Sequence, residues 1–340
     1  MSGARDGEGA APGALRSQID LHRDGVRTGD RRLLAKTITL LESRRADLAA
    51  VGQAVLEELV SYTGSGVRLG ITGTPGVGKS TFIEALGVHL IAKGHRVAVL
   101  AVDPSSPRSG GSILGDKTRM ERLSQHPAAF IRPSPSGGSL GGVAHRTRET
   151  LLLCEAAGFD VVIVETVGVG QSEVAVASMV DFFAVLLQPG AGDELQGMKK
   201  GVIELADALV VNKADGEQRD AARRARTMYR HALSVMRPAS ASWRPSVLLT
   251  SAVGGEGIDA FWEQVVSQRA ALAAAGELAA RRADQARAWM WSLVEEALQA
   301  SFRTHPGVAR ELRRLEAEVG AQKTSPGAAA RALLEAYRRR

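Results

Sequence analysis

Short apolar runs alternate with segments of helical spacing through the middle of the chain. The apolar runs are RLGIT, RVAVLAVD, DVVIVET, DFFAVLLQ, DALVVNKAD and SVLLTSA. Between them lie segments such as TRETLLLCEAAG and RDAARRARTMYRHALSVM, which are typical of helices. Strands that alternate with helices pair in parallel and are covered on both faces. The pattern therefore predicts an α/β fold with a mostly parallel, doubly wound sheet.

Both ends of the chain have a helical pattern without strands. Before the first strand, apolar residues recur at helical spacing, at Leu33, Leu34, Ile38, Leu41, Leu48, Val51, Val55 and Leu59. Asp30 is suited to cap the first helix there, whereas residues 1 to about 28 are expected to be disordered or weakly ordered. We expect residues 1–60 to form a disordered start and a helical extension, 61–265 the central domain, and 266–340 a C-terminal helical arm.

The C-terminal arm is broken at Pro306-Gly307 and at Ser325-Pro326-Gly327. Trp289 and Trp291 lie close together in it and must be buried against something. We favour contact with a second chain over a core of the arm's own, so the arm is predicted to dimerise the protein.

Composition narrows the classes of protein that fit. The net charge is +6, aromatics are 4% of the residues, and the basic residues are not interleaved with aromatics as base stacking requires, so nucleic-acid binding is disfavoured. Cys154 is the single cysteine, which excludes an internal disulfide or a Cys-based metal cage. It lies in an apolar helix and is expected to be a core residue.

No signal-peptide core or membrane-spanning run is present, which predicts a soluble cytoplasmic protein without a membrane partner.

The segment GTPGVGKST, residues 73–81, lies between a strand pattern and a helix pattern and matches GxxxxGK[ST]. Glycines let such a loop wrap phosphate groups closely, while backbone amides and the helix N-terminus supply positive potential. Lys79 is expected to reach the β- and γ-phosphates, and the Ser80 hydroxyl to ligate Mg²⁺. The predicted nucleotide-binding residues of this loop are Gly73, Thr74, Pro75, Gly76, Val77, Gly78, Lys79, Ser80 and Thr81.

The motif NKAD, residues 212–215, ends a later apolar strand and indicates the base. In GTPases the carboxylate of this motif, here Asp215, accepts from guanine N1–H and the exocyclic amine, a donor pair that adenine lacks. Asn212 would brace the neighbouring loops, and the Lys213 stem would pack on the base. Ser251 and Ala252, after the next strand, are expected to supply a backbone amide to guanine O6.

Carboxylates at other strand ends predict the Mg²⁺ and γ-phosphate side of the site. Asp103 ends the second apolar run, and Glu165 begins an ExxG motif that ends at Gly168. Parallel sheets bind ligands at the carboxyl ends of their strands, which favours these residues over incidental loop acids. The predicted metal ligands are Ser80, Asp103, Asp116 and Glu165, and the predicted catalytic residues are Lys79, Asp116, Glu165 and Gly168.

The residue that positions the attacking water is not evident. Ras-like enzymes have Gln directly after the ExxG glycine, whereas this chain has Val169, with Gln171 offset. We therefore expect slow GTP hydrolysis by the chain alone and acceleration when a partner orders the loops. Candidate charge stabilisers, each of which is more often a surface charge, are Arg108, Arg119, Lys199 and Lys200.

Together these motifs resemble one family. The segments that carry the resemblance are GTPGVGKSTFIEAL, VAVLAVDPSSPRSGGSILGDKTRM, FIRPSPSGGSLGG, VIVETVGVGQSE, QPGAGDELQGMKKGVIELAD and NKAD. They are similar to the MeaB/ArgK/MMAA family, the methylmalonyl-CoA mutase-associated GTPases. The resemblance extends from about Asp30 to about Pro306.

The resemblance implies a SIMIBI-class, homodimeric GTPase that uses GTP/GDP and Mg²⁺. Such proteins act as chaperones of adenosylcobalamin-dependent acyl-CoA mutases, in which they gate cofactor loading and protect or reactivate the enzyme. The partner would be methylmalonyl-CoA mutase or a relative such as isobutyryl- or 2-hydroxyisobutyryl-CoA mutase, and the adenosylcobalamin would belong to that partner. By position, the switch segments would be residues 105–120, 166–173 and 190–200.

Other functions remain open. A metal-insertion GTPase of the hydrogenase or urease maturation type would need Cys/His ligands, and this chain has one Cys and seven His. A kinase-type enzyme, as the ArgK label suggests, would need an acceptor pocket, and NKAD disfavours ATP. A dimer that binds GTP without hydrolysing it is disfavoured by Lys79, Ser80 and Glu165. No segment of the chain identifies the acyl group of the mutase substrate.

Overall fold

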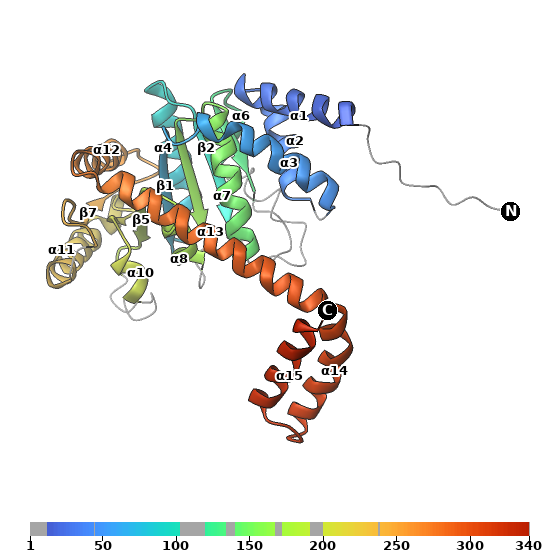
Figure 1. The fold of residues 1–340 in the computed structure, drawn as a ribbon. Helices are drawn as coiled ribbons and strands as arrows, with labels where there is room; N and C mark the ends of the chain where they lie inside the picture. Colours follow the sequence, from blue (N-terminus) through green and yellow to red (C-terminus); the bar gives the residue numbers. More distant parts are fainter. Residues whose placement is uncertain are drawn as a thin grey trace. The chain divides into compact units, whose positions relative to one another are not determined.

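The computed structural model describes residues 12–43, 45–102, 120–133, 140–166, 172–190, 200–236 and 239–339 (Figure 1). The chain divides into two compact units, Met1–Arg282 and Ala283–Arg340. The first unit contains the sheet and the helices around it, and the second contains most of one long helix and a helical hairpin. No helix in the described ranges combines the length and apolar character that crossing a bilayer requires.

A seven-stranded sheet forms the centre of the first unit, in the order β3-β2-β4-β1-β5-β6-β7. All of its strand pairs are parallel. The predicted parallel, doubly wound fold is therefore confirmed. The short edge strand β3 has no counterpart among the expected apolar runs. The strands are β1 (Val67–Gly73), β2 (Val97–Val102), β3 (Ala129–Arg132), β4 (Val161–Thr166), β5 (Phe182–Leu187), β6 (Ala208–Val211) and β7 (Ser246–Leu249).

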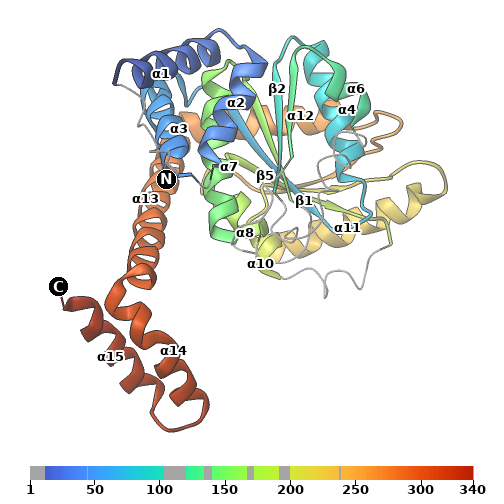
Figure 2. The ribbon, with the colours of Figure 1, turned by 90° about the vertical axis from the view of Figure 1, so that its right-hand side faces the viewer.

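Helices cover both faces of the sheet (Figures 1 and 2). On one face, Phe261 packs edge-to-face against Phe82 and Phe182, with ring centroids 5.1 and 5.9 Å apart. That face is covered by α4 (Lys79–Ala92), α6 (Glu121–Gln125) and α12 (Ile258–Ala274). The opposite core includes residues of α7 (Leu140–Ala156), α8 (Ser172–Ala177), α10 (Lys200–Glu204) and α11 (Arg219–Val235). The short 3-10 helix η2 (Gly216–Gln218) precedes α11.

Three N-terminal helices share this second core. They are α1 (Pro12–Arg27), α2 (Arg31–Leu41) and α3 (Ala46–Leu59), followed by the 3-10 helix η1 (Val60–Tyr62). As predicted, Asp30 caps α2, because its side chain accepts hydrogen bonds from the backbone amides of Arg32 and Leu33 at 2.8 and 3.0 Å. Leu34 and Val55 are buried completely in this core.

The expectation that the chain is weakly ordered up to about residue 28 is wrong for residues 12–27. These residues form α1, in which Ile19 and Val26 are buried and His22 hydrogen-bonds Thr37 at 2.8 Å. Ile19, His22 and Val26 lie three and four positions apart, so one face of the helix meets α2 and α3. The apolar face is narrow and includes a histidine, which explains why the pattern was missed.

Buried titratable groups of helix α7 include Cys154 and Glu149. Cys154 is completely buried, as expected for a core residue, and burial raises the pKa of its thiol. Glu149 is 4% exposed, and burial raises the pKa of its carboxyl to about 7. His145 lies one turn earlier, with its Nε2 atom 3.5 Å from Glu149 Oε1.

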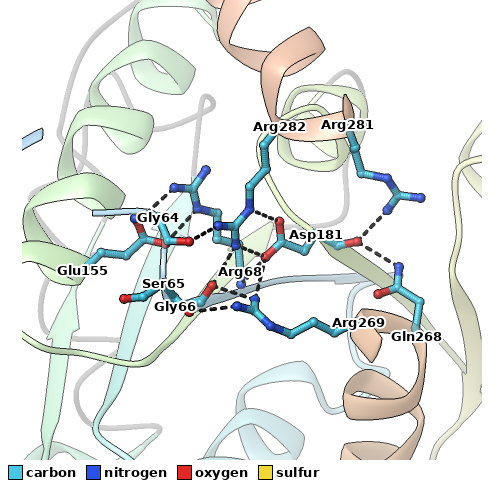
Figure 3. Close-up of polar contacts among 10 residues, drawn as sticks. All are labelled: Gly64, Ser65, Gly66, Arg68, Glu155, Asp181, Gln268, Arg269, Arg281 and Arg282. Carbon is cyan, nitrogen blue, oxygen red and sulfur yellow. Dashed lines mark hydrogen bonds and ion pairs between the residues drawn. The ribbon is translucent and has the colours of Figure 1, made fainter. Parts of the chain in front are cut away.

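Helix α13 (Glu277–Thr304) begins in the first unit, where its first turns contact a group of buried charges. The Arg282 guanidinium donates to the Asp181 carboxylate through Nε and Nη2, at 2.8 and 2.5 Å (Figure 3). Asp181 also accepts from the Arg68 amide at 3.0 Å, and Gln268 donates to its carbonyl at 3.0 Å. We call Arg68, Asp181, Gln268, Arg281 and Arg282 the basal cluster.

The basal cluster lies at the amino-terminal edge of the sheet. Asp181 directly precedes β5, and Arg68 is the second residue of β1. Asp207, which directly precedes β6, receives longer contacts of 3.4 and 3.5 Å from Arg281. Burial raises the pKa of the Asp207 carboxyl, and the Arg281 charge partly opposes this. The start of α13 therefore contacts the amino-terminal ends of β1, β5 and β6. These ends lie at the edge of the sheet opposite the phosphate loop.

In the second unit, α14 (Pro306–Gly320) and α15 (Pro326–Arg338) form an antiparallel pair. Both helices begin at a proline, at the two predicted breaks, and the Ser325 hydroxyl caps α15 by accepting from the Ala328 amide at 3.2 Å. Val308 and Leu315 of α14 are buried. On α13, however, Trp291 is 60% exposed in the single chain. The predicted role of residues 266–340 as a dimerisation arm stays a prediction.

Candidate nucleotide-binding site

The phosphate loop joins the carboxyl end of β1 to the N-terminus of α4. Gly78 caps α4 in the left-handed conformation, with φ of 93°. A Cβ at this position would lie 2.9 Å from Asn212 Nδ2, so both the backbone angle and the available space require glycine. The helix therefore starts inside the loop, and its first amides point toward the region where phosphates bind in such loops.

Lys79 lies at the start of α4 with only 9% of its surface exposed. Its ammonium group donates to the carbonyls of Gly73 and Thr74, at 2.7 and 3.2 Å. The cation is thus held across the loop by two backbone acceptors. A positive charge in this position fits a loop that binds phosphate groups.

Ser80, in the first turn of α4, meets Glu165 at the end of β4. The Ser80 hydroxyl donates to Glu165 Oε1 at 3.3 Å, and Glu165 is 8% exposed at the end of β4. The pairing of Ile71 with Glu165 across β1 and β4 brings the acid beside the loop. One hydroxyl and one carboxylate supply the hard oxygen donors that Mg²⁺ prefers, so this pair fits that ion.

A threonine pair beside these residues did not figure in the sequence prediction. The hydroxyls of Thr72 and Thr166 are hydrogen-bonded at 2.6 Å, and both side chains are buried. They connect the carboxyl ends of β1 and β4, and Thr72 directly precedes the phosphate loop. Their only sequence signal is a threonine at the end of each apolar run.

Asn212 connects three segments behind the phosphate loop. Its amide nitrogen donates to the Val77 carbonyl at 3.0 Å, and its oxygen accepts from the Thr250 hydroxyl and the Ala252 amide, at 3.2 and 3.3 Å. Asn212 is 1% exposed, so these bonds are shielded from water. The geometry agrees with the bracing role expected for Asn212 and adds Thr250 as a partner.

Lys213 extends along the same loop. Its backbone is left-handed, with φ of 58°, and its ammonium donates to the Gly76 carbonyl at 2.7 Å. Asp215 follows it and is partly exposed. These residues lie at the carboxyl end of β6, beside the phosphate loop, and leave the Asp215 carboxylate accessible to a ligand.

The remaining predicted residues differ in their surroundings. Ser251 is 1% exposed, and its hydroxyl accepts from the Gly254 amide at 3.1 Å, which shapes the loop after β7. Thr74 contributes a buried hydroxyl that has no hydrogen-bond partner among the described atoms. Pro75 and Thr81 are exposed. A buried hydroxyl without a partner in a phosphate loop is consistent with a site built for a polar ligand.

Several predicted residues lie outside the described ranges. These are Asp103, Asp116, Gly168, Val169, Gln171, Arg108, Arg119 and Lys199, together with the Lys200 side chain. Most of the three expected switch segments lies there too. The described residues therefore bring together Lys79, Ser80, Glu165 and the NKAD motif.

Comparisons with known proteins identify the relatives of this chain. The family model described as "Methylmalonyl Co-A mutase-associated GTPase MeaB" matches residues 34–307. A Caulobacter vibrioides protein provisionally named a GTPase is 58% identical over 319 residues, which cover 94% of this chain and 98% of that protein. The Mus musculus protein named methylmalonic aciduria type A homolog, mitochondrial, is 46% identical over 332 residues, covering 95% of this chain and 80% of that protein.

A solved structure also matches most of the chain. The crystal structure described as a LAO/AO transport system kinase superposes with a TM-score of 0.76 at 40% sequence identity. The match covers 96% of this chain and 99% of the other. The arrangement of sheet and helices is therefore shared over nearly the full length of both chains.

Proposed function

Because the chain belongs to the family of methylmalonyl-CoA mutase-associated GTPases, and is itself a P-loop GTPase, we propose that it is a chaperone of an adenosylcobalamin-dependent acyl-CoA mutase. It hydrolyses GTP, gates the loading of the mutase cofactor, and protects or reactivates the mutase. The partner is methylmalonyl-CoA mutase or a close relative such as isobutyryl- or 2-hydroxyisobutyryl-CoA mutase.

The observation that carries the GTP assignment is the Asn212 connection between the phosphate loop and the loop after β7. It supports a single site in which phosphate and base are held by neighbouring strand ends. In this site Asp215 reads guanine, the Lys213 stem packs on the base, and the Ala252 amide meets guanine O6. Lys79 contacts the β- and γ-phosphates.

Magnesium fits the hydroxyl and carboxylate that meet at the other side of the loop. Ser80 and Glu165 would hold the ion, with Asp103 and Asp116 as further ligands. When bound, Mg²⁺ neutralises charge on the β- and γ-phosphates. Glu165 keeps its carboxylate next to the loop because β4 and β1 pair in register, so this side of the site is built by the sheet.

The chaperone switches between two states, one before and one after GTP hydrolysis. Bound GTP orders the segments of residues 105–120, 166–173 and 190–200, and the ordered surface binds the mutase with its cofactor site open. Hydrolysis removes the γ-phosphate contacts and allows the site to close. The chaperone can shift the mutase only by the difference in its affinity for the open and closed states.

Two assembly features complete the proposal. The chain works as a homodimer in the cytoplasm, and the exposed Trp291 on α13 supports burial of the arm against a second chain.

Val169 in place of a water-positioning glutamine supports slow GTP turnover by the chain alone.

A kinase is the second candidate, because the matched solved structure is described as a LAO/AO transport system kinase. A kinase must transfer the γ-phosphoryl group to an acceptor, whereas the proposed GTPase transfers it to water.

Metal-insertion chemistry is a third candidate. Within the residues that the structure describes, no group of three or more His, Cys, Asp or Glu side chains is placed to hold a metal ion.

The test is GTP turnover by the purified chain, alone and with each candidate mutase loaded with adenosylcobalamin. We expect slow release of free phosphate, raised severalfold by one mutase and abolished in Lys79→Ala. Lys93→Ala, an exposed lysine at the end of α4, is the matched control and should turn over normally. Fast turnover that no mutase changes, or phosphate transferred to a small acceptor, would refute the chaperone function.

A further inference from the structure

A cavity of about 410 Å³ lies beside the end of α11. Its apolar lining includes Ile203 of α10, Leu233 of α11, Met236 directly after α11, and Val247 of β7. Ile203 and Val247 are 5% and 9% exposed, so the cavity reaches down to the core. Because Val247 is at the amino-terminal end of β7, the cavity and the nucleotide site lie at opposite edges of the sheet.

Two arginines line the same cavity. Arg230 comes from α11 and Arg244 from the segment before β7, and both are exposed. Neither side chain has a hydrogen bond or an ion pair within the described part of the chain. Glu204 is the single acid among the lining residues. The cavity therefore combines an apolar interior with excess positive charge.

The positive charge continues along α11. Arg219, Arg223, Arg226 and Arg230 are spaced by four, three and four residues, which places them on one face of the helix. We call these four residues the α11 arginine ridge. It is about 16 Å long at 1.5 Å per residue and ends at the cavity.

The neutralisation of the ridge is weak. Arg219 pairs with Glu256 at 3.5 Å and Arg223 with Asp220 at 3.4 Å, and all four side chains are more than half exposed. Such pairs are screened by salt and contribute little. Arg226, like Arg230, has no hydrogen bond or ion pair from its side chain within the described residues. The ridge can thus exchange its present partners for stronger external ones.

We propose that the α11 arginine ridge and its cavity form a docking site for an acidic segment of a partner protein. Carboxylates of the segment pair with Arg226, Arg230 and Arg244, and one apolar side chain fills the cavity. A buried apolar anchor surrounded by charged pairs is a common arrangement in protein interfaces. This site is independent of the proposed mutase function.

The dimensions favour a peptide over other anions. A ridge of about 16 Å matches roughly five residues of extended chain at 3.3 Å each, whereas a small anion would cover one or two arginines. Proteins bind single-stranded nucleic acid largely by stacking its bases on exposed aromatics, and Tyr229, the one Phe, Tyr or Trp of α11, is 1% exposed.

The probe is a short fluorescent glutamate-rich peptide with one central leucine, titrated into the full-length protein at low salt and followed by anisotropy. We expect saturable binding that weakens as salt is added. The paired substitution Arg226→Glu and Arg230→Glu should weaken binding at least about tenfold, through lost and reversed charge pairs. Arg224→Glu, an exposed arginine on a different face of α11, is the matched control.

A second peptide tests the cavity. Replacing the central leucine by serine should weaken binding about tenfold, and Ser234→Phe, which fills the cavity from α11, should remove that difference. GTP turnover should stay unchanged in all these variants. Equal binding by the ridge variant and the wild type, or equal affinity for the leucine and serine peptides, would overturn the proposal. Tighter binding of a single-stranded oligonucleotide or of anionic vesicles than of the peptide would overturn it as well.

Discussion

Asp181 offers a direct test of how the first unit holds the start of α13. Its side chain is 2% exposed and accepts from Arg282 at 2.5 and 2.8 Å and from the Arg68 amide at 3.0 Å. Asp181→Ala would remove these acceptors and leave the Arg282 charge, 16% exposed, without its carboxylate.

The expected cost follows from these contacts. Removing one partner of a buried ion pair costs about 3–5 kcal/mol. Here the Arg282 guanidinium keeps the carbonyls of Gly64 and Gly66 as acceptors, so we place the loss of unfolding free energy at about 3 kcal/mol, the lower end. The double variant Asp181→Ala with Arg282→Met should lose less than the sum of its single variants, because the Arg282 charge is then no longer left without its carboxylate.

Urea unfolding followed by circular dichroism measures this, with the midpoint and slope compared among variants. The control is Asp220→Ala, which removes an acid that is 77% exposed from its pair with Arg223 and should leave the midpoint unchanged. If Asp181→Ala cost less than about 1 kcal/mol, the pair would contribute no more than a surface pair, and the reasoning from burial would be refuted.

Four further predictions concern the site, helix α7 and the arm. Asp215→Asn should reduce the preference for GTP over XTP at least about tenfold, because hydrogen bonds to a charged acceptor contribute about 1.5–3 kcal/mol; equal selectivity in competition binding would contradict this. Asn212→Ala should lower the unfolding free energy by about 2 kcal/mol and weaken GTP binding, as calorimetry can show, since it leaves buried groups unpaired. Burial raises the pKa of the Glu149 carboxyl from 4.5 to about 7, so its charge destabilises the folded state above pH 7, and wild-type stability relative to Glu149→Gln should increase as the pH falls from 7 toward 4.5. At pH 8 Glu149→Gln should therefore be more stable by about 3 kcal/mol in urea unfolding, and a difference independent of pH would disprove this. Deletion of residues 283–340 should yield monomers, and a dimer in light scattering would assign dimerisation to the first unit.

Much of the central fold follows from local pattern alone. The apolar runs predicted six of the strands, and an apolar strand followed by a helix implies a parallel sheet with helices on both faces. The phosphate loop was predictable because its chemistry depends on contiguous residues: Gly78 must adopt a left-handed backbone, and Lys79 must follow it. The edge strand β3 was not predicted, since its apolar residues are interrupted by Arg132 and flanked by Pro127 and Pro133.

Tertiary structure decided the contacts between residues far apart in the chain. The sequence placed Asn212 at a strand end, but only the order of strands brings it to Val77 and Thr250. Likewise, the hydroxyl pair of Thr72 and Thr166 exists because β1 and β4 are neighbours despite the strands between them in sequence. Pairing of non-adjacent strands leaves no local signal.

By itself the sequence determined the fold class, the family and the nucleotide loop, because each depends on residue types at short fixed spacings. Only the tertiary structure decided the basal cluster, the ordered helix α1 and the cavity beside the α11 arginine ridge. These depend on which distant side chains become neighbours. Burial then decides which charges are strongly held, as for Asp181, and which remain available at the surface, as for Arg230.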